Sequence, residues 1–124
     1  DDLIAVVADG RRGAVGPILR RLEAQGVDPV AITIAATRHF MALQAATRHP
    51  DGPAAGVAGL RPPVHFRVRD GLLAQARRWS SPRLDKALSM LIETDLALRS
   101  NAPLPRMALV ERCLIRLSMM AGGR

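Results

Sequence analysis

Apolar residues recur at helical spacing in two neighbouring segments of the second half of the chain. The first stripe repeats at alternating intervals of four and three residues and consists of Leu84, Leu88, Leu91, Asp95 and Leu98. The second stripe runs through Met107, Val110, Leu114 and Leu117. Such spacing places each set on one face of an α-helix. Because only a short turn with prolines separates the two segments, we expect the two helices to pack antiparallel.

Local signals mark the ends of the first of these helices. Ser81 followed by Pro82 indicates its start, because a serine hydroxyl caps the first amides and a proline in the first turn has no amide hydrogen to lose. The stripe ends at residues 100–101, and Pro103 and Pro105 then interrupt helical structure. The sequence therefore predicts a helix, a proline-containing turn and a second helix here.

Asp95 is the one charged residue in the first stripe. An unpaired carboxylate on an apolar face is costly, so we expect Asp95 to be largely buried and to accept hydrogen bonds from Arg99 or from the start of the last helix. Glu111 of the last helix completes a candidate network of Asp95, Arg99 and Glu111. We interpret this network as structural, not as a catalytic carboxylate site, because buried acids are generally paired.

Four further helices are predicted upstream, from the same periodicity and from the glycines and prolines between them. They cover residues 2–9, 14–25, 29–49 and 64–78, and the Gly- and Pro-rich segment before the last of them has room for a short helix over 53–57. The expected inward-facing residues are Leu3, Val6 and Val7, then Ile18, Leu19 and Leu22, then Ile32, Ala35, Ala36, His39, Phe40 and Leu43, and finally Phe66, Leu72, Leu73 and Ala76. Trp79 stands at the corner before the next helix, and we expect it to pack against that helix.

Composition favours the all-α class. Apolar residues make up 48% of the 124 residues but aromatic residues only 2%, so the core is built from Leu, Ala, Ile, Val and Met, which suit helices better than a β-sandwich. The only strand-like alternative is the short run IAVVA near the start. We therefore expect one domain over 1–124 that forms a compact all-α bundle of five to six helices.

The net charge is +7, from seventeen arginines, one lysine and eleven acidic residues. A basic excess attracts nucleic acid or acidic partners. However, no block of five or more like charges appears, which favours arginines spread over solvated helix faces, as in GC-rich genomes. A small basic helical DNA-binding domain is the alternative. Against it, the sequence predicts no aromatic stacking platform and no helix with a compact cluster of base-reading Arg, Asn and Gln.

The chain offers few groups for chemistry. The glycines at 10, 13 and 16 lack the Lys-Ser/Thr and the preceding strand of a phosphate-binding loop. His39, His49 and His65 stand ten and sixteen residues apart without a Cys or acidic partner at ligand spacing, so we expect no metal site. We predict no catalytic, cofactor-binding or metal-ligating residue, and nothing in the pattern supports a small helical enzyme.

Cys113 is the only cysteine, which rules out an intramolecular disulfide and is consistent with a reducing compartment. We expect a buried, inert thiol inside the last helix. No signal peptide, lipidation motif or apolar run near twenty residues is visible. The chain starts at Asp1 without methionine, and we expect a fragment whose N-terminal part is absent.

Several motifs occur in an order that resembles one family. Pro62-Pro63 and Phe66 precede the run Q-A-R-R-W-S at 75–80, followed by D-L-A-L-R-S at 95–100 and A-L-V-E-R-C-L-I-R-L at 108–117. This order resembles the end of the delta subunit of the bacterial DNA polymerase III clamp loader, with its Pro-Pro, Gln-Ala-Arg-x-Trp-Ser, Asp-x-x-Leu-Lys/Arg and Leu-Glu-x-Leu-type motifs. The matching positions near the end are Asp95, Leu98, Arg99, Leu109 and Glu111.

The resemblance implies a helical collar domain that assembles a replication complex. In that family the collar joins delta to the motor (gamma/tau) and delta-prime subunits in a five-membered ring that loads the sliding clamp onto primed DNA in the cytoplasm. The AAA+-like and clamp-contacting domains would lie upstream of Asp1. The domain itself is expected to be non-catalytic, within a holoenzyme that has DNA-directed DNA polymerase (nucleotidyltransferase) activity. We also expect weak, non-specific DNA binding and no membrane association.

Overall fold

Every regular element of the computed structural model, which describes residues 2–100 and 103–122, is a helix. The helices are α1 (Asp2–Ala8), α2 (Arg12–Ala24), α3 (Pro29–Thr47), α4 (Pro53–Ala58), α5 (Phe66–Arg78), α6 (Ser81–Leu98) and α7 (Arg106–Ala121). The predicted all-α class is confirmed, and the expected helix boundaries from α1 to α5 agree within two residues. The described residues form seven helices instead of five to six, because the short segment 53–58 forms a helix of its own.

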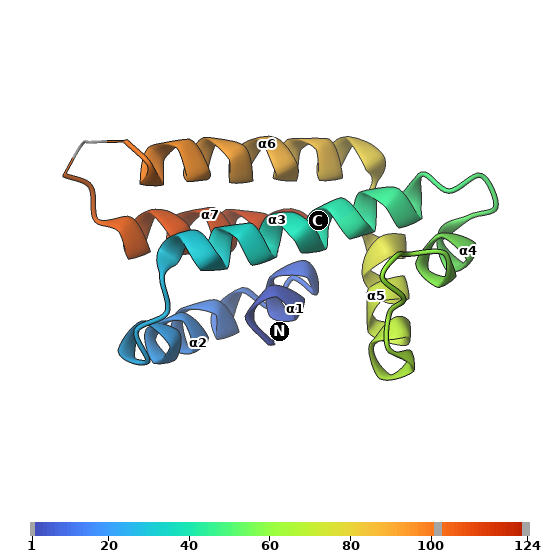
Figure 1. The fold of residues 1–124 in the computed structure, drawn as a ribbon, viewed down its shortest axis with the longest axis horizontal. Coiled ribbons are helices and arrows are strands. Elements are labelled where there is room, and N and C mark those ends of the chain that lie inside the picture. Colours follow the sequence, from blue (N-terminus) through green and yellow to red (C-terminus); the bar gives the residue numbers. More distant parts are fainter. Residues whose placement is uncertain (1, 101–102, 123–124) are drawn as a thin grey trace.

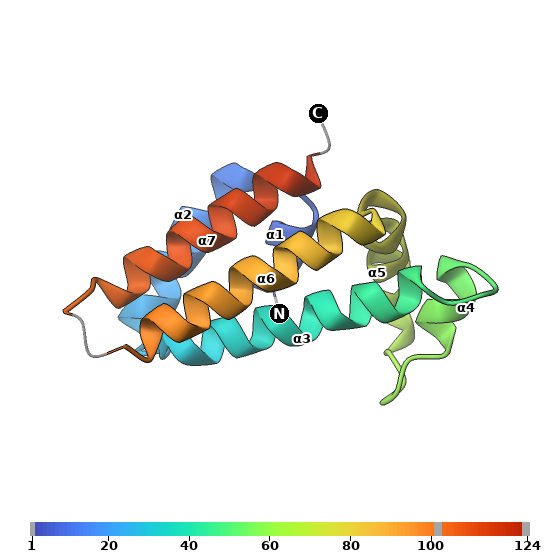
Figure 2. The ribbon, with the colours of Figure 1, turned by 90° about the horizontal axis from the view of Figure 1, so that it is seen from above.

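The three long helices α3, α6 and α7 form the body of the molecule (Figure 1). Seen from above, α6 lies between α3 and α7 and runs antiparallel to both (Figure 2). The short α1 and α2 cover the opposite side of this layer, while α4 and α5 stand at the end where α3 finishes and α6 begins. The antiparallel pairing predicted for the last two helices is confirmed.

Capping residues mark where α3 and α6 begin. The Asp28 carboxylate accepts a hydrogen bond from the Val30 amide at 2.7 Å, which starts α3 at the following proline. In α6 the cap is Ser80, whose hydroxyl accepts from the Arg83 amide at 3.3 Å. The predicted cap at Ser81 was therefore one residue late, because the proline occupies the second helical position and not the first.

One aliphatic core connects the helices. The stripe residues Leu84, Leu91, Leu98, Val110, Leu114 and Leu117 are buried, as predicted, and Leu88 and Met107 are partly buried against them. Phe40 and Trp79 are the largest fully buried side chains. Their rings meet edge-to-face with centroids 4.9 Å apart, which adds a specific aromatic contact to an otherwise aliphatic interior.

Trp79 occupies the corner between α5 and α6 and is 1% exposed. Its indole Nε1–H donates a hydrogen bond to the backbone carbonyl of Ala8 at 3.0 Å. Thus the contacts that define its position are made with α3, through Phe40, and with the end of α1. A buried indole N–H needs such an acceptor, and here the acceptor lies near the N-terminus of the chain.

The periodicity of the sequence predicts that Phe66 faces inward, but its side chain is 69% exposed. The cause is the direction of α5, whose first turn lies far from the long helices and whose last turn joins α6 (Figure 1). Only the C-terminal half of α5 reaches the core, so that Gln75 and Ala76 are buried while residues 65–71 are all exposed. Periodicity identified a face of this helix but not its tilt away from the bundle.

Gly56 allows α4 to lie directly on α3. A Cβ atom built on this glycine would overlap the backbone of Ala46, so any larger residue would push the two helices apart. Gly71, in the exposed part of α5, is the opposite case, because a Cβ there would meet nothing within 4 Å.

We predict opposite effects for two glycine-to-alanine substitutions. Gly56→Ala should lower the free energy of unfolding by about 1–3 kcal/mol through overpacking. Gly71→Ala should raise it by about 0.5–1 kcal/mol, because alanine is the better helix former where space allows. Urea unfolding of both variants measures the difference. Equal effects of the two substitutions would contradict the close crossing of α3 and α4.

Candidate functional site

Asp95 and Arg99 form an ion pair within α6 and its C-terminal cap. The Arg99 Nε lies 3.1 Å from Asp95 Oδ1 and 3.0 Å from Oδ2. The side chains are 31% and 61% exposed for Asp95 and Arg99, respectively. Asp95 is therefore partly exposed instead of largely buried. Like Leu88 of the same stripe, it lies at the edge of the buried face of α6, whereas Leu91 and Leu98 lie inside it. Such a pair along one helix contributes about 0.3–0.5 kcal/mol.

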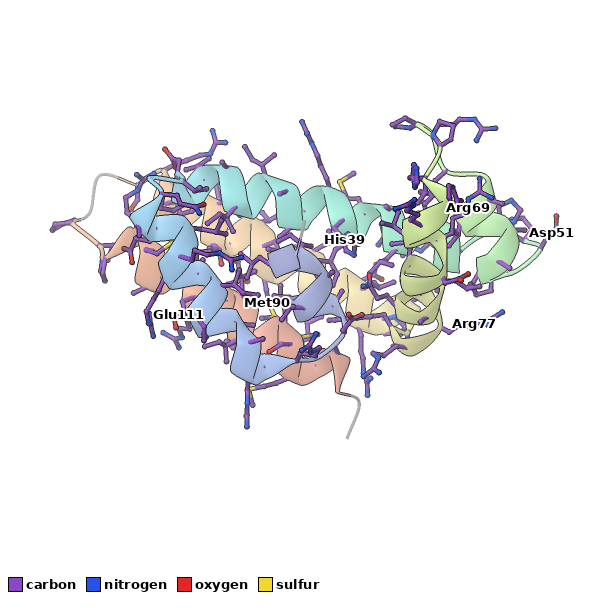
Figure 3. The ribbon with its side chains drawn as sticks, turned by 90° about the horizontal axis from the view of Figure 1, so that it is seen from below. His39, Asp51, Arg69, Arg77, Met90 and Glu111 are labelled. Carbon is purple, nitrogen blue, oxygen red and sulfur yellow. The ribbon has the colours of Figure 1, made fainter. Side chains whose placement is uncertain are left out.

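Glu111 belongs to a different pair. Its carboxylate lies 3.5 Å from Arg20 Nη1 of α2, and the side chains are 25% and 68% exposed for Glu111 and Arg20. Figure 3 shows Glu111 beside α2, at the end of the molecule opposite to Arg69 and Arg77 of α5. Within the described residues the predicted three-residue network is thus two separate surface pairs, and neither Asp95 nor Arg99 bonds to Glu111.

A polar chain that residue spacing does not reveal joins three helices. Gln75, only 4% exposed, donates from Nε2 to the Asp9 carboxylate at 2.9 Å. Its Oε1 therefore faces His39 Nε2, 2.6 Å away, and His39 must carry the hydrogen on Nε2 and donate it. Asp9 directly follows α1, His39 lies on α3, and Gln75 lies on α5. His39 is thus a hydrogen-bonded histidine.

The burial of His39 changes its titration. Desolvation lowers the pKa of the imidazole below its ordinary value, and the hydrogen bond with Gln75 opposes this shift only partly. Burial favours the neutral imidazole, and its Nε2–H tautomer keeps the hydrogen bond to Gln75. An uncharged, hydrogen-bonded imidazole of this kind connects helices and has no adjacent nucleophile to activate among the described residues.

We predict a pH dependence of stability that depends on His39. Because its pKa is lower in the folded than in the unfolded chain, the unfolded chain binds more protons as the pH falls below about 6.5, and stability decreases there. Replacing His39 by glutamine should reduce the loss of stability between about pH 7.5 and about pH 5.5. Thermal unfolding at both pH values measures this loss of stability. His65→Asn, which keeps a capping acceptor, serves as the control and should lose as much stability as the parent. An equally large loss in His39→Gln would contradict the role of His39.

Cys113 is 5% exposed, as predicted, and burial raises the pKa of its thiol. The thiol faces the α6 backbone, with the Met90 carbonyl 4.0 Å from Sγ. A raised pKa keeps the sulfur protonated near neutral pH, and a protonated thiol is a poor nucleophile. The residue therefore has the character of a small core side chain.

The first turn of α5 and the residues before it form an exposed aromatic and basic surface, here called the α5 tip. It consists of Arg61, His65, Phe66, Arg67, Val68 and Arg69, all exposed. The rings of His65 and Phe66 stack with centroids 4.6 Å apart, and the Arg67 guanidinium lies 5.8 Å from the centre of the Phe66 ring. This stacking platform was missed because Phe66 was expected in the core. The signal that identifies it is three arginines within nine residues around one phenylalanine.

Grooves on the surface are small. One of about 250 Å³ lies between α6 and α7, and another of about 330 Å³ lies where α2 ends beside the start of α7. Within residues 2–100 and 103–122, no three His, Cys, Asp or Glu side chains are placed to hold a metal ion. No helix of this described part has the length and apolar character needed to span a membrane.

Comparison with protein-family models, with curated proteins and with solved structures found no match to this chain. The resemblance to the clamp-loader delta subunit therefore rests on the residues alone.

Proposed function

We propose that this chain is a non-catalytic assembly module, the helical collar of a clamp-loader delta subunit of DNA polymerase III. It would join delta to the motor and delta-prime subunits in the ring that loads the sliding clamp during DNA replication. The observation that carries the proposal is the ordered set of motifs at residues 62–63, 66, 75–80, 95–99 and 109–111. These motifs cover most of the second half of the chain.

The positions of the motif residues support this proposal. Gln75, Ala76 and Trp79 are buried, and Ser80 caps α6, so the Q-A-R-R-W-S motif specifies a corner between two helices. Asp95 and Arg99 pair at the end of α6, where the proline-containing turn begins. Motif residues that hold helices together are expected of an assembly domain, whereas an enzyme motif would gather reactive groups at a cleft.

We predict complex formation that does not depend on ATP. The chain lacks a phosphate-binding loop, so it should bind the C-terminal domains of the motor and delta-prime subunits equally well with and without the nucleotide. The affinity is expected to be about micromolar, because helix faces of domain size guarantee no tighter binding. Co-elution on a sizing column, with and without ATP, shows whether the complex forms.

Two controls sharpen this experiment. The isolated chain should bind neither ATP in equilibrium dialysis nor the sliding clamp on the same column, because it has no phosphate-binding loop and its matched motifs belong to the collar alone. Failure to form a complex with either partner at concentrations well above micromolar would contradict the proposal.

The α5 tip favours a second candidate function, binding of single-stranded nucleic acid. Phe66 offers an exposed ring on which a base can stack, and Arg61, Arg67 and Arg69 can neutralise neighbouring phosphates. Such a surface recognises bases and phosphates without reading sequence. It is compatible with weak DNA contact by a collar as well as with an independent DNA-binding domain.

We predict that Phe66→Ala and Arg67→Ala weaken single-stranded DNA binding in different ways. Loss of the stacking ring should cost about 1–3 kcal/mol at any salt concentration. Loss of the arginine should reduce the salt slope of the binding constant by about 1. Arg77→Ala, at the other end of α5, is the matched control and should leave stacking unchanged. Fluorescence anisotropy across a salt series measures the binding of all three variants. Parent-like binding by both tip variants would contradict the assignment of the α5 tip as a nucleic-acid surface. A tight preference for one duplex sequence at physiological salt would contradict the collar proposal.

A further inference from the structure

The groove between α6 and α7 combines an apolar floor with two oppositely charged walls. Its floor is formed by Met90, Ala97, Leu109 and Cys113, and its walls by Glu93 and Thr94 on α6 and by Arg112 and Arg116 on α7. Thr94 turns its hydroxyl to the Met90 carbonyl at 2.9 Å and so adds little free polarity to the floor. None of its lining residues takes part in the ion pairs Asp95–Arg99 and Arg20–Glu111.

The charged groups on the two walls are free to meet a ligand. Among the described residues, neither Arg112 nor Arg116 forms a hydrogen bond or an ion pair, and Glu93 forms none either. All three side chains are exposed. Most other described arginines are likewise exposed, but these two stand one helical turn apart and both line the groove.

The outer side of α6 carries two further exposed apolar residues. Ile92 and Leu96, one turn apart, are 57% and 64% exposed and are neighbours in the chain of the groove residues Glu93 and Ala97. Successive residues of a helix are about 100° apart around its axis, so Glu93 lies between these two side chains and the groove floor. The apolar surface beside Arg112 and Arg116 is therefore the floor of the groove itself. In Figure 2 this side of α6 and α7 is uncovered by any other helix of the chain.

We propose that this groove binds an amphipathic helix of another protein that carries two carboxylates four residues apart. Arg112 and Arg116 are separated by one turn, about 6 Å along the helix axis, and acidic side chains at positions i and i+4 repeat at the same distance. Each guanidinium then meets one carboxylate, a charge-assisted contact. The apolar side chains of the partner helix fill the floor over Met90, Leu109 and Cys113.

Two other occupants fit less well. A second copy of this chain carries a net charge of +7 and has no two acidic residues three or four positions apart. A nucleic acid would bring phosphates against Glu93 and leave the apolar floor without a matching surface. A helix satisfies both walls, because it presents carboxylates on one flank and a neutral or basic side chain towards Glu93.

This inference rests on the proposed function only for the source of the helix, which a neighbouring collar domain would supply. Its test uses none of the clamp-loader subunits. A failed titration therefore leaves the result of the sizing-column experiment standing, and a failed sizing-column experiment leaves the groove to be tested by itself.

The experiment is an NMR titration of the ¹⁵N-labelled chain with a synthetic helical peptide. The peptide carries leucines along one face and two glutamates four residues apart on the flank of that face. A second peptide has lysines in place of the glutamates. We expect the glutamate peptide to shift the amide signals of residues 90–97 and 109–116, and the lysine peptide to bind at least tenfold more weakly.

Charge reversal on the protein provides the reciprocal test. The double variant Arg112→Glu with Arg116→Glu should lose at least tenfold in affinity for the glutamate peptide and gain affinity for the lysine peptide. Arg21→Glu with Arg77→Glu changes the net charge equally at free arginines away from the groove and should bind as the parent does. Dispersed amide spectra and buried Trp79 fluorescence verify that both variants fold.

The contrary outcomes are equally defined. Equal binding of both peptides, shifts confined to the α5 tip, or no shift at millimolar peptide would overturn the proposal. Shifts of the groove residues on raising the concentration of the chain alone would identify a second copy as the occupant, and shifts of the same residues by a single-stranded oligonucleotide would identify a nucleic acid. Both results would also overturn it.

Discussion

The hydrogen bond from the Trp79 indole to the Ala8 carbonyl connects two parts of the chain that are 71 residues apart. It is buried, and it lies next to the bond between Gln75 and Asp9, so the end of α1 is held twice by the corner between α5 and α6. Unpaired, the indole N–H and the Ala8 carbonyl would each carry a desolvation penalty. The position of α1, and with it the closure of the core below α3 and α7, depends on this corner.

These two contacts at the corner are on the inner side of the helices, and the outer sides of the helices face solvent. The two surfaces with the clearest chemistry are far apart. The α5 tip stands at one end of the molecule, whereas the groove is lined by the C-terminal half of α6 and the N-terminal half of α7, which lie towards the other end. One surface is basic and aromatic, which suits a nucleic acid, and the other is apolar with paired arginines, which suits an acidic helix.

The sequence predicted most of the fold because periodicity, capping residues and prolines are local signals. Leu84, Leu91 and Leu114 were assigned correctly to the core for that reason. The errors at Phe66 and Glu111 have another cause. Periodicity places a residue on a face of its helix, but the helix that covers this face is decided by distant parts of the chain. Arg20 is 91 residues from Glu111, and Asp9 is 66 residues from Gln75, so neither partner was predictable from spacing.

The Q-A-R-R-W-S motif holds the end of α1 against the corner between α5 and α6 through the buried Trp79 and Gln75. The most direct test is the hydrogen-exchange rate of the Trp79 indole N–H, which gives a single unambiguous NMR signal because the chain has one tryptophan. A proton bonded to the Ala8 carbonyl in the core should exchange only through global unfolding, at the rate of the most protected backbone amides of α3 and α6. Exchange of the indole proton at the rate of an exposed tryptophan would contradict the account.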